Sequence, residues 1–272
     1  MHIRAGVSMI RRRAFLILLT TWIVPLTANA QAACEPPTVL GESKIAAILD
    51  ARTLRLVDGR EIRLTGIEIP KSAEADGTTW LRNHALHQTA TLRGTDDSPD
   101  RYGRQHAFVL IAGKPDTLQS ALAEAGVALS SGTVRDESCA RELKSAESRA
   151  EKSKRGAWAQ PDFVESGSKP SSILKHIGRF TLVDGTILSA RQAGSTLYLN
   201  FGRRRIQGFA VTISRRMMPA FAAAGINAAT LEGRRIRVRG WIERHGGPRI
   251  EARAPGQIEF IGGKETAAAG DK

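Results

Sequence analysis

The chain has 272 residues, of which 42% are apolar, so it can bury one or two ordinary cores and does not need disulfides or metals to hold a small core together. Its 40 lysines and arginines outnumber the 27 aspartates and glutamates, and the net charge is +13. This charge favours a polyanionic partner without identifying one. Residues 31–171 hold 19 basic and 20 acidic residues, whereas residues 172–262 hold 15 basic and 5 acidic residues. The C-terminal part therefore carries most of the basic surplus.

The N-terminus has the three parts of a secretory signal peptide. A basic stretch ends at Arg13, an apolar run covers 14–26, and Ala28-Asn29-Ala30 provides a small-residue cleavage site. The pair Arg12-Arg13 also fits a twin-arginine signal, but the general secretory route is favoured because no lysine follows. The alternative is an uncleaved anchor. We expect residues 1–30 to be removed, leaving a bacterial periplasmic or secreted protein with no further segment long enough for a membrane helix.

Two cysteines remain after that cleavage, Cys34 and Cys139. An even number of cysteines in an oxidising compartment favours a disulfide between them. Such a bridge closes a loop of about 100 residues and stabilises the fold by about 4–5 kcal/mol on the chain-entropy model. Lipidation of Cys34 is the alternative, and the residues before it make a poor acylation site.

Alternating apolar residues in 44–69 predict two or three strands, with a hairpin at Asp58-Gly59. Hydrophobic periodicity and turn residues predict the remaining helices and strands of a first domain, which covers residues 31–158. Its remaining predicted elements are a helix over 77–89, strands over 90–92 and 105–111, and helices over 117–125 and 137–154.

A linker is predicted over 159–171, because this stretch is rich in proline, serine and glycine and has no periodicity. A second domain follows over 172–262, and residues 263–272 read as a disordered tail. Five strands and one helix suit a small β-barrel of the OB type. The strands are expected over 180–190, 197–201, 207–213, 234–241 and 249–253, and the helix over 217–224.

Four short segments of the first domain occur in a characteristic order. They are Asp50-Ala51-Arg52-Thr53, Ile62-Arg63-Leu64, Gly66-Ile67-Glu68-Ile69-Pro70-Lys71 and Asp100-Arg101-Tyr102-Gly103-Arg104. Each is weak alone, but the ordered set resembles the thermonuclease (staphylococcal nuclease-like) family over about residues 44–158. The resemblance implies a five-stranded OB barrel capped by helices, so the expected fold class is mainly β with α.

The resemblance also implies a chemistry. In that family two aspartates hold a calcium ion, two arginines clamp the phosphate, and a glutamate takes a proton from the attacking water, which suits a reaction that builds charge on phosphoryl oxygens. Arg63 and Arg104 match the two arginines. Tyr102 keeps an aromatic hydroxyl close to Arg104, so the phosphate clamp is expected to survive.

The metal and base positions depart from the family pattern. Asp50 is kept, but Arg52 stands at a calcium-ligand position and Glu68 replaces the second ligand aspartate, which makes Asp50 and Glu68 a weak metal site. Lys71 stands at the general-base position, and lysine, with an ordinary pKa of about 10.4, is protonated at neutral pH. Glu74, in an expected loop, is a rescue candidate for the base. Ion pairing of Arg63 and Arg104 with Asp50 or Glu68 is an alternative to phosphate binding.

Two arginine clusters mark the second domain as a binding surface. One follows a predicted strand, and the other alternates along a strand opposite Ile236 and Val238, so its members share one face. With nearby aromatic residues this face resembles the surfaces by which OB folds bind single strands. The alternative is a solvated basic face. The clusters are Arg203, Arg204 and Arg205, and Arg235, Arg237 and Arg239.

Together these features favour an exported nuclease-like protein that binds DNA, RNA or another polyanion with impaired or no phosphodiester hydrolysis. One alternative is an active phosphodiesterase with a non-standard metal or base. Another is an envelope module that binds protein or a wall polymer. No cofactor is expected, apart from calcium if the protein is catalytically active. Nothing in the sequence fixes an oligomeric state.

Overall fold

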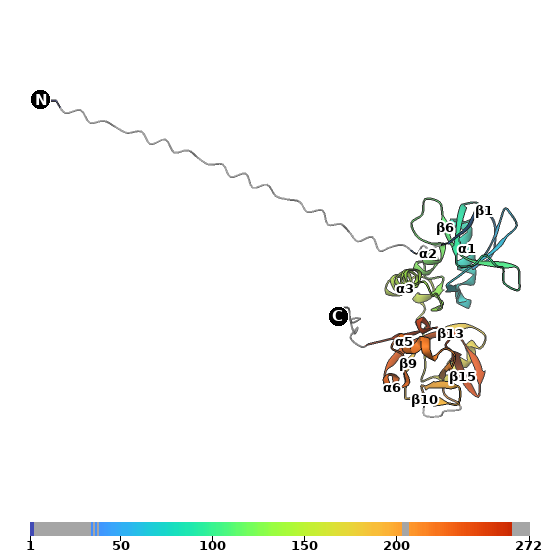
Figure 1. Ribbon diagram of the computed structural model, residues 1–272, viewed down its shortest axis with the longest axis vertical. Coiled ribbons are helices and arrows are strands. Elements are labelled where there is room, and N and C mark those ends of the chain that lie inside the picture. The colour runs from blue at the N-terminus through green and yellow to red at the C-terminus, as the bar shows by residue number, and fades with distance from the viewer. Residues whose placement is uncertain (3–33, 35, 37, 203–206, 263–272) are drawn as a thin grey trace. The chain divides into compact units, whose positions relative to one another are not determined.

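The computed structural model describes residues 1–2, 34, 36, 38–202 and 207–262 (Figure 1). Contacts divide the chain into two units, Met1–Gln31 and Ala32–Lys272, and the fold described below lies in the second. Three predictions fall outside the described residues: the signal peptide beyond its first two residues, Arg203, Arg204 and Arg205, and the tail over 263–272. No helix in the described part of the chain is long and apolar enough to cross a membrane.

Five strands of the N-terminal part form a closed barrel, as the resemblance implies. Their order is β1-β2-β3-β6-β5, and the long strand β1 closes the barrel by pairing with β2 at one end and β5 at the other. Alternate side chains point inward and are fully buried, including Ile45, Leu54 and Ile62. The strands are β1 (Thr38–Asp50), β2 (Thr53–Leu56), β3 (Glu61–Leu64), β5 (Thr89–Gly94) and β6 (Arg104–Ile111).

Short helices and one two-stranded sheet surround this barrel. The side chain of Thr117 caps α2 by accepting a hydrogen bond from the Ser120 N–H, and Asp136 caps α3 in the same way through the Cys139 N–H. The elements are β4 (Ile67–Glu68), η1 (Lys71–Ala73), α1 (Glu74–His84), α2 (Leu118–Glu124), β7 (Leu129–Ser130), α3 (Glu137–Lys152) and η2 (Gly156–Ala159). Helix α1 begins three residues earlier than predicted, so Glu74 is helical and the expectation that it lies in a loop is wrong.

The C-terminal part consists of two sheets around one core, which corrects the expectation of a second barrel. The chain passes between the two sheets four times, over 187–188, 215–234, 242 and 252–257. One sheet contains β10 (Ser189–Ala193), β11 (Thr196–Asn200), β12 (Ala210–Ser214), β15 (Gly247–Glu251) and β14 (Glu243–His245). The other contains β16 (Ile258–Phe260), β13 (Arg235–Trp241), β9 (Phe180–Thr186) and β8 (Glu165–Ser166).

The segment predicted as a linker contains ordered structure. Strand β8 pairs in parallel with β9, and Phe163 packs its ring edge against Trp158 at 5.0 Å between centroids. The division into two domains stays a prediction, since residues 32–272 form one unit by their contacts. The remaining helices are α4 (Pro170–Ile173), η3 (Leu174–His176), α5 (Met218–Ala223), α6 (Ala228–Leu231) and η4 (Pro255–Gln257).

A small hydrophobic core joins the N-terminal and C-terminal parts. It contains Leu129, Ala150 and Trp158 from the N-terminal part and Phe180 and Leu182 from β9. All five are buried, so the two parts share a packed, apolar interface. This interface fixes where β13 lies relative to the barrel, and thereby positions the site described next.

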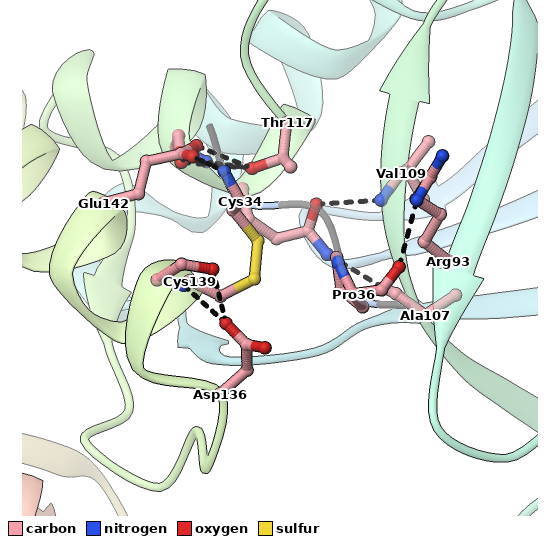
Figure 2. The surroundings of a disulfide bond; sticks show 12 residues. Cys34, Pro36, Arg93, Ala107, Val109, Thr117, Asp136, Cys139 and Glu142 are labelled. Atoms are coloured by element: carbon pink, nitrogen blue, oxygen red, sulfur yellow. Dashed lines mark hydrogen bonds between the residues drawn. A yellow bond between two sulfur atoms is a disulfide. The ribbon is translucent and has the colours of Figure 1, made fainter. Parts of the chain in front are cut away.

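The predicted disulfide between Cys34 and Cys139 is present (Figure 2). It ties Cys34 to the first turn of α3. Figure 2 shows Glu142 beside it, accepting hydrogen bonds from the Cys34 N–H and the Thr117 hydroxyl. The Ser120 hydroxyl also donates to Glu142. The disulfide is consistent with an oxidising, extracytoplasmic compartment.

Candidate functional site

Arg63 projects from β3 beside the end of β1, where the chain turns into β2. Its Nη1 donates to the Thr53 hydroxyl at 2.8 Å and lies 3.3 Å from Asp50 Oδ2. Burial and the positive charge of Arg52 lower the pKa of Arg63, while Asp50 opposes them and Arg104 adds to them. The arginine side chain is 23% exposed and that of Asp50 is 53% exposed, so solvent reaches this pair.

Arg52 occupies the turn between β1 and β2. Its guanidinium forms an ion pair with Glu68 on β4, and its Nε donates to the Leu64 carbonyl at 3.0 Å. Its backbone N–H donates to Asp50 Oδ1 at 2.7 Å. The Arg52 and Glu68 side chains are only 13% and 15% exposed, so this ion pair is a fixed part of the turn.

This residue set does not fit a calcium ion. Calcium takes about six to eight oxygen ligands, mainly carboxylates and carbonyls. Here the Asp50 carboxylate accepts from Thr53 and faces Arg63, and the Glu68 carboxylate binds Arg52. A guanidinium therefore supplies the positive charge at the position where a cation would bind. In the part of the chain that the structure describes, no three His, Cys, Asp or Glu side chains gather as a metal site.

Arg104, at the start of β6, points to the same side of the barrel as Arg63. Strands β3 and β6 are parallel, with Glu61 paired to Arg104 and Arg63 paired to His106. Side chains two residues apart on a strand share a face, so Arg63 and Arg104 lie on the same face of the sheet. Arg104 binds the Asp100 carboxylate through Nη2 at 2.8 Å, instead of the Asp50 or Glu68 partners considered from the sequence. This hydrogen bond raises the pKa of Arg104.

Tyr102 lies in the loop before β6 and is largely exposed. The guanidinium carbons of Arg101 and Arg104 each lie 4.8 Å from its ring centroid, within cation–π distance. Arg101 also donates to the tyrosine hydroxyl at 2.7 Å. Tyr102 therefore stands beside Arg104, with its ring accessible from solvent.

Lys71 and Glu74 form an exposed ion pair, with 2.6 Å between Nζ and Oε2. Lys71 follows Pro70 and begins η1, and Glu74 begins α1. Glu74 faces the same hollow as Arg52 and Arg63. The carboxylate nearest to the predicted general-base position thus lies at the site with a lysine ammonium as its partner.

Asp50, Arg52, Arg63, Glu68 and Glu74 line a hollow of about 370 Å³, whereas Lys71, Tyr102 and Arg104 do not line it. Its wall also includes Trp241, at the end of β13, one of the aromatic residues near the arginines of the second domain that the sequence suggested for stacking. The available signal was its position directly after the alternating arginines, but sequence spacing alone does not place β13 beside the barrel. The lining residues are Leu49, Asp50, Ala51, Arg52, Arg63, Glu68, Ile69, Glu74, Thr78 and Trp241.

A comparison with protein families matches residues 61–160 to the staphylococcal nuclease homologue family. This part of the chain is a nuclease homologue domain. The match includes Arg63, Glu68, Lys71, Glu74 and Arg104. The match begins at residue 61, so the turn with Asp50 and Arg52 lies before it. Strands β1 and β2 also lie before the match, although they belong to the same barrel. No curated protein matches the chain.

Arg237 and Arg239 of β13 face the nuclease homologue domain, which corrects the prediction of an exposed stripe of three arginines. Arg239 is 2% exposed and binds Glu147 at 2.8 Å, and Arg237 binds Glu151 and Asp184, each at 2.8 Å. Only Arg235 of the three is exposed. The alternation itself was predicted correctly, because Ile236 and Val238 point into the opposite core.

Proposed function

We propose that this protein is exported and binds single-stranded nucleic acid through the phosphodiester backbone, with little or no hydrolysis. The observation that carries the proposal is the hollow beside the barrel, where Arg52 and Arg63 stand and the carboxylates of Glu68 and Asp50 are paired with them. Guanidinium groups recognise phosphate oxygens through paired hydrogen bonds and keep their charge at all physiological pH values.

The contacts that the Arg63 guanidinium makes with its neighbours are weak enough for a ligand to replace them. Thr53 supplies a neutral hydroxyl, and Asp50 is 53% exposed at 3.3 Å, so this pair is long and solvated. Exposed pairs of this kind contribute at most about 1 kcal/mol. A phosphodiester offers two non-bridging oxygens that share one negative charge in a fork geometry, and it is the better partner for the guanidinium. The match to a nuclease family makes nucleic acid the expected source of that phosphodiester.

The same geometry argues against efficient cleavage. The guanidinium of Arg52 is committed to Glu68, so it cannot deliver a nucleophilic water as a metal ion does. Lys71 stands where the family resemblance puts the base, and it binds Glu74. Loss of a general base costs about 10²–10⁴-fold in rate.

The test measures binding and cleavage with the purified protein. Fluorescence anisotropy with single-stranded DNA and RNA is recorded over a salt series, and cleavage is followed with calcium and with a chelator. Arg63→Ala is expected to weaken binding and to reduce the slope of log K against log salt by about 0.7, the single-strand value for one phosphate contact. Arg55→Ala is the matched control, because Arg55 is exposed on the neighbouring strand β2 and lies outside the hollow.

Rapid calcium-dependent cleavage would contradict the proposal. So would equal binding by the Arg63→Ala and Arg55→Ala variants. A heparin-like chain that binds while DNA and RNA fail to compete would point instead to an envelope polymer as the ligand.

One observation favours a second function, hydrolysis with a non-standard base. Glu74 lines the hollow with Arg63, so its carboxylate stands where it can take a proton from water if Lys71 moves aside. Glu74→Gln would then abolish slow, metal-independent cleavage and leave binding unchanged. Binding without any turnover, in both the native protein and this variant, is the outcome expected from our proposal.

A further inference from the structure

Trp241 is a large aromatic side chain left half exposed at the junction of the two parts. It ends β13, and its exposed fraction is 52%. Its ring meets Phe180 of β9 edge to face, with 6.1 Å between centroids and 74° between planes. Phe180 is buried, so it supports one edge of the tryptophan ring while solvent reaches the rest.

Two hollows meet at Trp241. The first is the arginine-lined hollow described above, and the second also measures about 370 Å³. Glu68 and Trp241 line both. The second hollow is otherwise lined by Ser131, Thr133, Phe180, Glu243, Glu251, Arg253 and Gln257.

The chemistry of the second hollow differs from that of the first. Its carboxylates Glu243 and Glu251 are bound to Arg249 and Arg253, at 2.8 and 2.9 Å. The hydroxyls of Ser131 and Thr133 contact each other at 2.8 Å. Paired charges, hydroxyls and aromatic rings disfavour a phosphate here and suit a neutral ring with hydrogen-bonding edges.

We propose that Trp241 is a stacking platform for a nucleobase whose flanking phosphate is held at Arg63. The inference rests on the proposed function and adds the part of the ligand that the C-terminal part recognises. A single strand running from the first hollow to the second brings a base onto the exposed indole face. Base stacking on an aromatic ring tolerates any base, so the site selects single strands rather than a sequence.

The test compares a single-stranded DNA oligonucleotide with an abasic oligonucleotide of the same length and with inorganic polyphosphate. Removing the platform with Trp241→Ala is expected to weaken DNA binding by about 5- to 150-fold, the range for one stacked base. The same variant is expected to bind the abasic strand and polyphosphate as the native protein does. Trp241→Phe keeps a ring and is expected to stay within about threefold of native for DNA.

Phe260→Ala is the matched control. Phe260 is another exposed aromatic, 38% exposed on the neighbouring strand β16, and it lines neither hollow. Its removal is expected to leave all three affinities unchanged. Quenching of tryptophan fluorescence by DNA, present in the native protein and reduced in Trp241→Phe, gives a readout independent of affinity.

The outcomes separate the two proposals. If the native protein binds DNA and the abasic strand equally, and Trp241→Ala changes neither affinity, the platform is refuted while phosphate binding stands. If Trp241→Ala weakens both ligands equally, the residue supports the fold of the site and the platform is again refuted. If the native protein binds none of the three ligands, the proposed function fails together with the platform.

Discussion

Arg239 Nη1 lies 2.8 Å from Glu147 Oε2, with the side chains 2% and 0% exposed, and this pair joins β13 to α3. Arg239 Nη1 also donates to the Ser130 carbonyl at 2.9 Å, and the Ser130 N–H donates to Glu147 at 2.6 Å. Burial is the largest influence and raises the pKa of Glu147, but the charges of Arg239 and Lys144 and the hydrogen bonds from Arg239 and Ser130 together lower the pKa below its ordinary value. The carboxylate therefore stays charged inside the interface.

Removing one partner of this pair leaves a buried charge uncompensated. Arg239→Met is expected to lower the free energy of unfolding by about 3–5 kcal/mol, because breaking a buried pair costs more than the pair contributes. Combining it with Glu147→Leu is expected to recover most of the loss. Urea unfolding of the three proteins measures both effects, and equal stability of the single and double variants would contradict the coupling.

Loss of the disulfide is expected to destabilise the protein by about 4–5 kcal/mol, since the bridge closes a loop of 105 residues. The measurement is urea unfolding of the native protein and of the Cys34→Ser, Cys139→Ser double variant. Reductant is expected to lower the native midpoint toward that of the variant, which itself should not respond. A native midpoint unaffected by full reduction would show that packing around Glu142 suffices.

The helix cap at Asp136 gives α3 a dependence on pH. Hydrogen bonds from the Ser138 hydroxyl and the Cys139 N–H lower its pKa below the ordinary value of 3.8. Its stabilisation is therefore complete above about pH 4–5 and is lost as pH falls through the folded-state pKa. Asp136→Ala is expected to cost about 1 kcal/mol at neutral pH.

Asp136→Asn is the matched control for that cap. An asparagine side chain also accepts the N–H hydrogen bond, so stability at pH 7 should stay close to native. Melting temperatures of the three proteins between pH 3 and 7 check the sign. The gap between native and Asp136→Ala should narrow with acid, and a constant gap would contradict the role of the carboxylate.

Restoring the family carboxylates should restore metal dependence. The triple variant Arg52→Asp, Glu68→Asp, Lys71→Glu replaces the internal guanidinium and supplies a base, and we expect calcium-dependent cleavage at least about 10²-fold above native. Cleavage of single-stranded DNA with calcium or a chelator measures it. The same triple variant with Arg63→Ala is the control, because it lacks the phosphate clamp and should be inactive.

Much of the barrel could be predicted from the sequence, because alternating apolar and polar residues along a strand indicate which side chains point inward. The hairpin at Asp58-Gly59 and the interior position of Ile62 follow from such local rules. The start of α1 was missed for an equally local reason. Its cap residue, Ala73, offers no side-chain hydrogen bond, so Glu74 carried no start signal.

The sequence identified individual residues near the candidate site but not the elements that pack around them. The two-residue spacing of Arg237 and Arg239 predicts that they share one face of a strand, but it does not indicate which element packs on that face. The complementary signal is on α3, where Glu147 and Glu151 are four residues apart and so also share a face. Matching acids at helical spacing with arginines at strand spacing would have predicted this interface, and with it the place of Trp241.

The small core of Leu129, Ala150, Trp158, Phe180 and Leu182 has a consequence for how the protein can be divided. Cutting the chain at residue 160, where the family match ends, would strip Phe180 and Leu182 from this core and leave Glu147 without Arg239. A fragment with these exposed groups should aggregate or unfold. The two parts are therefore expected to melt in a single cooperative transition.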